Sequence, residues 1–186
     1  MLNDPWEEVE TKAIANMVRY IKEARLAAGL KAGAEFDELI ALGNLADLGA
    51  KEDYVDTTVD YSTLAGYVSE VKFMLDGTNA AYLITLTSSD VDVSVKFVDG
   101  EEIALADSTT TENAKYTTGT RVYDIANKAI EITVTIPAAD GGEPTVITGT
   151  YSVKAYINAT DNALTKAMYE FGVAADAYRS FLMEDN

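Results

Sequence analysis

The chain has 186 residues, of which 48% are hydrophobic, so it is long enough and apolar enough to bury a core. Its 31 acidic and 14 basic residues give a net charge of −17, which disfavours binding to nucleic acids and to anionic membrane surfaces. Cysteine and histidine are absent, which excludes disulfides, zinc sites built from these residues and the Ser-His and Cys-His catalytic pairs. No stretch approaches the roughly 20 apolar residues of a membrane span, so membrane insertion is not expected.

The first predicted element is a helix from Pro5 to about residue 28. Pro5 suits the first helical position, and Gly29 is a typical terminator. Apolar residues recur at helical spacing and predict its buried face: Trp6, Val9, Ala13, Met17, Tyr20, Ala24 and Ala27. A short second helix is predicted at 36–43, and the polar, acidic stretch 51–60 is typical of a loop.

The middle of the chain, residues 64–151, predicts antiparallel strands joined by short turns. An Asp-Gly turn at 76–79 joins the first predicted hairpin, whose strands are 68–75 and 82–87. The remaining predicted strands are 91–97, 102–105, 121–125, 129–136 and 145–151, with 121–125 and 129–136 forming a second hairpin. The Thr-rich stretch 107–119 is interpreted as a long loop or a sheet edge.

A second long helix is predicted at about 161–183, and its small residue Gly172 is expected to lie against a neighbouring backbone. Helix, strands and helix in this order indicate an α+β fold. We expect an antiparallel β-sandwich or curled sheet of six to seven strands, flanked by N- and C-terminal helices. No linker interrupts the pattern, so residues 1–186 are predicted to form a single domain.

Acidic residues cluster in the loop before the first strand. Asp53, Asp56 and Asp60 offer the oxygen ligands that calcium prefers, although their spacing does not match an EF-hand loop. The alternative is a solvated acidic loop without a metal. No other cofactor is expected.

Exposed tyrosines are candidate sugar-stacking residues. Tyr116 and Tyr123 flank the Thr-rich stretch and are the predicted ligand-binding residues, with the alternative that they cover the edge of the core with their hydroxyls in water.

Paired carboxylates would be needed for glycosidase chemistry. Glu70, Glu101, Glu102 and Glu131 are candidates for such a pair. They are also typical of solvated strand faces, which we favour for all four.

Residues 167–178, AMYEFGVAADAY, carry a resemblance. The segment resembles a helix of large secreted, multi-modular surface proteins from gut and cellulolytic Clostridia, including Ruminococcus relatives. Residues 149–157 and 17–21 resemble the corresponding parts of those proteins. The chain departs from the pattern at Phe171, where tyrosine is usual, and at Asp176, where glutamine is usual. Both changes keep the two faces of the helix, but any role of that glutamine is not carried over.

The resemblance implies an extracellular or cell-wall-associated protein and no particular activity. The acidic N-terminal segment is unlike a signal peptide, so we expect a fragment of a larger secreted protein. The expected function is a non-catalytic structural or adhesion module that contacts a glycan or another cell-surface protein. The alternatives are a carbohydrate-binding module with a tyrosine-lined face and, third, a two-carboxylate glycoside hydrolase.

Overall fold

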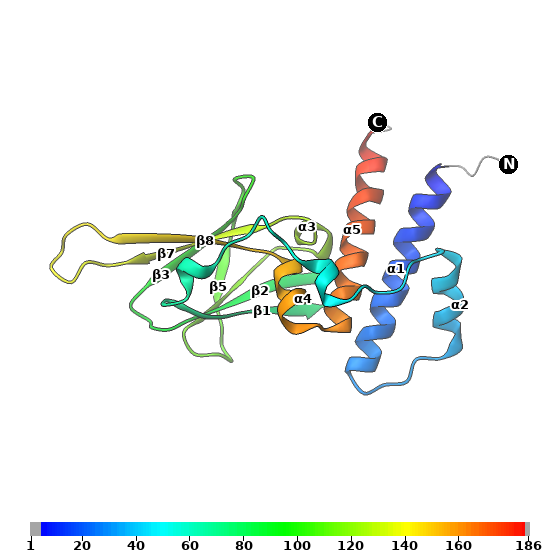
Figure 1. The fold of residues 1–186 in the computed structure, drawn as a ribbon, viewed down its shortest axis with the longest axis horizontal. Helices are drawn as coiled ribbons and strands as arrows, with labels where there is room; N and C mark the ends of the chain where they lie inside the picture. Colours follow the sequence, from blue (N-terminus) through cyan, green and yellow to red (C-terminus); the bar gives the residue numbers. More distant parts are fainter. Residues whose placement is uncertain (1–4, 185–186) are drawn as a thin grey trace. The chain divides into compact units, whose positions relative to one another are not determined.

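A computed structural model describes residues 5–184 (Figure 1). The fold is α+β, as predicted, with helices at both ends and two antiparallel four-stranded sheets between them. The described residues divide into two compact units. The helical unit comprises 5–55, 122–127 and 157–184, and the β unit comprises 56–121 and 128–156. The single domain stays a prediction.

The helices have the following bounds: α1 Pro5–Ala27, α2 Ala34–Leu42, α3 Val122–Ile125, α4 Val153–Thr160 and α5 Ala163–Glu184, with short 3-10 turns η1 at Lys51–Tyr54 and η2 at Ser62–Leu64. The helices α1, α2 and α5 match the predicted helices to within about two residues at each end.

Helices α1 and α5 pack side by side in the helical unit, where the rings of Tyr20 and Phe171 stack at 5.9 Å. The close approach predicted at Gly172 is confirmed. A Cβ atom there would lie 2.5 Å from the Cβ of Ala126 and 2.7 Å from the carbonyl oxygen of Val122 in α3. Only a glycine therefore lets α5 approach α3 at this point.

The predicted stripe of α1 is partly wrong. Ala13 and Tyr20 are buried as expected, but Met17 is 37% exposed, and Ala15 and Val18 are buried in its place. The reason is that α1 contacts α5 on one side and α2 on another, so its buried residues occupy two faces instead of one stripe. The side chain of Trp6 lies outside the described residues.

The strands of the β unit form two sheets, A and B. Sheet A has the order β1 Val68–Asp76, β2 Asn79–Leu86, β6 Ala114–Thr117 and β5 Leu105–Asp107. Sheet B has the order β4 Glu102–Ile103, β3 Asp92–Phe97, β7 Ile130–Ile136 and β8 Thr145–Tyr151. The eight strands exceed the predicted six to seven because β4 and β5 are only two and three residues long.

Alternating burial along the strands defines the core of the β unit. In β2 the side chains of Tyr82 and Ile84 are buried, and in β7 those of Ile130, Ile132 and Val134 are. The ring of Tyr82 contacts that of Tyr151 from sheet B at 6.3 Å. The inner faces of the two sheets therefore meet through aromatic side chains, as in a sandwich.

Two predicted segments differ from the structure. Residues 121–125 were expected to be a strand, but Val122–Ile125 forms the short helix α3, and Val122 and Ile125 are completely buried. Packing against α5 overrides the β-propensity of this segment. Strand β7 consequently pairs with β3 and β8 instead of forming the second predicted hairpin. The segment 107–119 was predicted to be a loop or a sheet edge, but it contains β6, an interior strand of sheet A. The edge strand of sheet A on this side is β5, which ends at Asp107.

Candidate functional site

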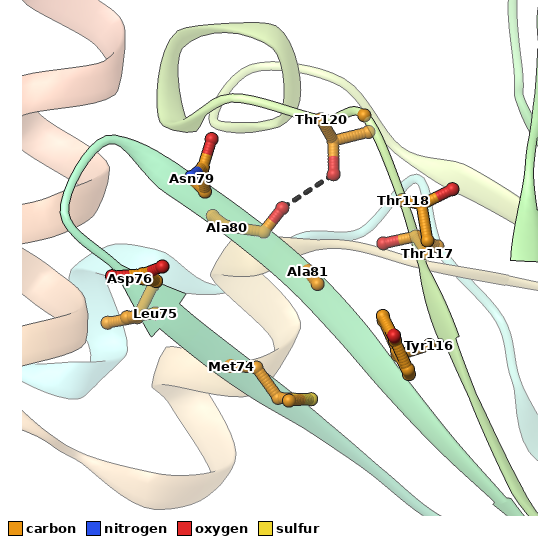
Figure 2. A pocket seen from close by; sticks show the side chains of 11 residues that line it. Met74, Leu75, Asp76, Asn79, Ala80, Ala81, Tyr116, Thr117, Thr118 and Thr120 are labelled. Carbon is orange, nitrogen blue, oxygen red and sulfur yellow. Dashed lines mark hydrogen bonds between the residues drawn. The ribbon is translucent and has the colours of Figure 1, made fainter. Parts of the chain in front are cut away.

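A groove lies on the outer face of sheet A (Figure 2). Met74 of β1 is paired with Ala81 of β2, and Tyr116 of β6 is paired with Leu83, two residues further along β2. Paired residues and alternate residues of a strand share a face of the sheet, so Met74, Ala81 and Tyr116 project from the same side. The small methyl group of Ala81 lies between the two larger side chains and forms the floor of a space of about 280 Å³.

A β-bulge shapes one end of this groove. Leu83 of β2 pairs with Tyr116, and further along Asn79 of β2 pairs with Arg121. Between these two pairs the chain advances by four residues on β2 but by five residues on the opposite strand. The extra residue is accommodated where Gly119 takes a φ of +75°. The segment after Tyr116 stays bonded to β2, because the backbone N–H of Ala80 donates to the carbonyl oxygen of Thr120 at 3.3 Å. The extra residue places Thr118 and Gly119 at this end of the groove.

Two threonine side chains form hydrogen bonds with backbone groups of β2 on either side of the bulge. The Thr117 hydroxyl accepts a hydrogen bond from the backbone N–H of Tyr82 at 2.9 Å. The Thr120 hydroxyl donates to the carbonyl oxygen of Ala80 at 2.5 Å, shown as the dashed line in Figure 2. Both threonines are buried, so these bonds fix the backbone that carries the groove.

The rim of the groove is polar. Asp76 and Asn79 lie at the β1–β2 turn, and Thr118 lies on the bulged segment. The side-chain oxygen of Asn79 accepts a hydrogen bond from Arg121, which orients its amide group. The Thr118 hydroxyl lies 3.3 Å from the carbonyl oxygen of Ala104. The groove thus combines an aromatic ring and an apolar floor with a carboxylate, an amide and hydroxyl groups.

This composition sets the chemistry of the groove. Asp76 is the one ionisable carboxylate among its lining residues, and no lysine or arginine lines it. A glycosidase pair needs two carboxylates across the scissile bond, and a phosphate site needs cationic or helix N-terminal donors. The lining residues instead suit a neutral, hydroxyl-rich ligand that stacks on a ring and forms hydrogen bonds at the rim.

The structure places the two predicted tyrosines in different units. Tyr116 lines the groove of the β unit. Tyr123 lies in α3 of the helical unit, where the guanidinium group of Arg179 lies over its ring at 4.9 Å. Arg179 is held there by ion pairs with Asp124 at 3.1 Å and Asp176 at 2.8 Å. One face of the Tyr123 ring is therefore already occupied.

The predicted calcium ligands are also divided between the units. Asp53 belongs to the helical unit, and Asp56 and Asp60 belong to the β unit. Across residues 5–184, no group of three or more acidic side chains is arranged to hold a metal ion. Calcium binding by these residues stays a prediction.

Hydrogen bonds give Asp56 and Asp60 structural roles. Asp56 accepts bonds from the backbone N–H and the hydroxyl of Thr58, and Asp60 accepts one from the N–H of Ser62. Partial burial acts to raise the pKa of Asp56, but hydrogen bonds from Thr58 and Ser152 outweigh it and lower the pKa overall. Hydrogen bonding to Ser62 lowers the pKa of Asp60. Both carboxylates are therefore held in the charged form, Asp60 by its own loop and Asp56 by its loop together with Ser152.

The acidic residues proposed for hydrolase chemistry lie on strands or at strand ends. Glu70 forms an ion pair with Lys72 at 2.9 Å, and Glu131 forms one with Lys96 at 3.2 Å. Neither Glu101 nor Glu102 lines the groove, and both are exposed.

A polar cluster in the helical unit fixes the segment that follows α2. The Tyr54 hydroxyl donates to Glu170 of α5 at 3.0 Å, and Arg19 of α1 donates to the carbonyl oxygen of Ala46 at 2.6 Å. Burial, together with the neighbouring Glu170 carboxylate, raises the pKa of Tyr54, while burial lowers the pKa of Arg19. These contacts tie one segment to two helices and explain the cluster without a ligand.

Tyr116 was predicted to bind a ligand and lines the groove, but its binding role stays a prediction, and Met74, Ala81 and Asn79 were not predicted. The β1–β2 hairpin itself is predictable, but the position of β6 beside β2 is not, because that pairing joins residues about 30 apart in the sequence. In the sequence, the bulge is marked by Gly119, which adopts a positive φ angle in the structure. A glycine in a Thr-rich segment is equally typical of a loop, so it does not predict a bulge.

No protein-family model, curated protein or solved structure matches the chain. Within residues 5–184, no helix combines the length and the apolar character that crossing a bilayer requires.

Proposed function

We propose that the protein is a non-catalytic module that binds a neutral glycan chain through the groove on sheet A. The observation that carries this proposal is the combination in one groove of the Tyr116 ring, the Ala81 floor and the polar rim of Asp76, Asn79 and Thr118. A sugar ring has apolar C–H faces and a girdle of hydroxyls, so it suits a surface with an aromatic centre and polar edges.

Charge favours a neutral glycan over an acidic one. The chain carries a net charge of −17, and the groove presents the Asp76 carboxylate without a lining cation. An anionic polysaccharide would be repelled by this field, whereas a neutral one would not.

We place this module in a bacterial extracellular or cell-wall-associated protein. This part of the proposal is supported by the resemblance of residues 167–178 to helices of secreted clostridial surface proteins. In such a setting a non-catalytic glycan contact would serve adhesion or attachment to a polysaccharide.

Native affinity gels test the proposal. Gels are cast with neutral plant polysaccharides or mucin, with and without calcium, and loaded with wild type, Tyr116→Ala and Tyr123→Ala. We expect one neutral polymer to retard wild type and Tyr123→Ala, and Tyr116→Ala to migrate as it does without polymer. Circular dichroism establishes that each variant is folded.

Two results would contradict the proposal. Retardation by no polymer would remove the glycan as ligand, and the groove would then be tested against proteins. Equal retardation of wild type and Tyr116→Ala would place glycan binding elsewhere on the chain. A requirement for calcium would support the predicted metal ligands Asp53, Asp56 and Asp60, whose substitution by Asn would then abolish the calcium effect.

A further inference from the structure

Helix α1 is covered on two sides within the helical unit. Toward α5 it presents Tyr20, which stacks on Phe171. Toward α2 it presents Ala15, whose Cβ lies against Gly43, and Lys22, which pairs with Asp37 at 2.6 Å. Figure 1 shows α1 lying between α5 and α2.

An apolar stripe on α1 is left in solvent between these two sides. Ile14 is 49% exposed, Met17 is 37% exposed and Ile21 is 43% exposed. At 3.6 residues per turn, this stripe falls between the face that carries Tyr20 and the face that carries Lys22. The spacing of three and four residues is the pattern by which two helices pack along a seam.

Charge along α1 is unevenly distributed. Its N-terminal half carries Glu7, Glu8, Glu10 and Lys12, and its C-terminal half carries Arg19, Lys22, Glu23 and Arg25, so three acids against one base face three bases against one acid. A second copy of α1 in antiparallel orientation would place each acidic half beside a basic half. The same orientation would match the apolar stripe with itself.

We propose that the chain self-associates through this stripe, with two copies of α1 packed antiparallel about a two-fold axis at Met17. Met17 then contacts Met17 of the second copy, and Ile14 contacts Ile21 of the second copy. Glu10 lies near Arg25 of the second copy. An isologous contact of this kind is the commonest form of protein self-association.

The two charged side chains at the seam, Glu10 and Arg25, can contact a second copy. The Glu10 carboxylate accepts a long hydrogen bond of 3.5 Å from the Tyr178 hydroxyl. Arg25 donates through its Nε to the carbonyl oxygen of Lys31 at 3.0 Å, and its guanidinium group lies over the ring of Phe36 at 5.9 Å. Neither contact uses the hydrogen atoms of its terminal amino groups, which can donate to a partner. The net charge of −17 on each copy opposes unspecific association, so a dimer depends on this local match. The proposal is independent of the groove.

Sedimentation velocity over a range of protein concentrations tests it. We expect wild type to pass from monomer to dimer, and Met17→Lys to weaken the dimer at least about tenfold because two ammonium groups would meet at the axis. The matched control is Val98→Lys, which makes the same charge change at a 56% exposed apolar residue of the β unit. It should leave the dimer unchanged.

A charge-reversal cycle identifies the orientation. Glu10→Lys and Arg25→Glu should each weaken the dimer, and the double variant should recover most of the loss. Wild type that stays monomeric at every concentration would overturn the proposal. So would a dimer that Met17→Lys leaves intact, with circular dichroism confirming the fold. A dimer that both single reversals weaken and the double variant does not restore would exclude the antiparallel seam.

Discussion

Sheets A and B of the β unit have four antiparallel strands each but differ in regularity. In sheet B the register of β7 with β8 runs without a shift along all seven residues of each strand. Ser94, Thr133 and Thr148 consequently lie in one row across its outer face. In sheet A one extra residue interrupts the pairing between β2 and the strand that follows Tyr116. Regular pairing thus gives a row of hydroxyls on sheet B. Sheet A has a register shift between Val68 and Glu70 and an inserted residue after Tyr116, and the second of these borders the groove.

The edge strand β8 of sheet B is covered by the segment around η2. The backbone N–H of Thr150 donates to the carbonyl oxygen of Asp60 at 2.8 Å, and the Thr63 hydroxyl donates to that of Thr148 at 2.6 Å. Leu64 packs against Gly149 beneath these bonds. Covering β8 in this way protects a strand that would otherwise offer its backbone to another chain.

The largest expected effect concerns this covered edge. In Gly149→Ala the new Cβ would lie 2.7 Å from Cγ of Leu64 and 3.2 Å from the Asp60 carbonyl oxygen. Leu64 is almost fully buried and has little room to move, so we expect a loss of about 2 kcal/mol in the free energy of unfolding. Chemical denaturation measures it, with the neighbouring Thr148→Ala as a control that should change little. A loss as small as that of the control would mean that the segment over β8 is loosely held.

The second effect compares the glycine of the bulge with a glycine of a turn that has the same φ angle. Gly119 in sheet A and Gly141 between β7 and β8 both have a φ of +75°, and neither has an atom near the position of a Cβ. Replacing either with Ala should cost about 1 kcal/mol through backbone strain alone. Only Gly119→Ala should also weaken glycan retardation, because only that residue shapes the groove. Equal retardation for both variants would separate the bulge from binding.

A third effect concerns pH. The pKa of Asp56 is lowered in the folded state, so its contribution to stability is present above the unfolded value and is lost as pH falls through the folded one. Asp56→Asn should therefore cost about 1 kcal/mol at neutral pH, and the difference from wild type should shrink below about pH 4. Denaturation at neutral and acidic pH measures this difference. A constant difference would show that the charge of Asp56 is not what stabilises its loop.

The smallest effect is expected inside sheet A. The Tyr82 hydroxyl is completely buried, and the backbone of Val153 lies close enough to act on its pKa, but among the described residues no hydrogen bond of normal geometry reaches it. Removing an unsatisfied buried hydroxyl costs nothing or stabilises, so Tyr82→Phe should change the unfolding free energy by less than about 1 kcal/mol and in the stabilising direction. Tyr54→Phe is the matched variant, since its hydroxyl donates to Glu170, and it should destabilise by about 1 kcal/mol. A destabilised Tyr82→Phe would reveal a bound water or another partner.

Local patterns predicted much of this fold. The spacing of apolar residues and the flanking proline and glycine give α1, and the Asp-Gly turn gives the β1–β2 hairpin. Alternation gives β3 and β7 with their buried faces. Tyr116 lines a groove that the sequence does not predict, and its role in ligand contact stays a prediction.

Segments whose structure depends on distant contacts were misjudged. Val122–Ile125 has the composition of a strand but is a helix, because Val122 and Ala126 are needed against Gly172. Ala114–Thr117 is polar and short, and it is a strand because β2 offers it hydrogen bonds. Met17 is apolar and was expected in the core, but the sequence does not say which face of α1 meets α5 and which meets α2.

The sequence by itself determined the α+β class, the long helices, the first hairpin and the strongly acidic character, because each depends on residues close together in the chain or on composition alone. The tertiary structure decided the division into two units, the bulge beside Tyr116, the membership of Tyr116 and Tyr123 in different units and the exposed stripe on α1. These features depend on which elements meet in space. Such pairings follow from the summed burial of many side chains, and no short segment of the chain encodes that sum.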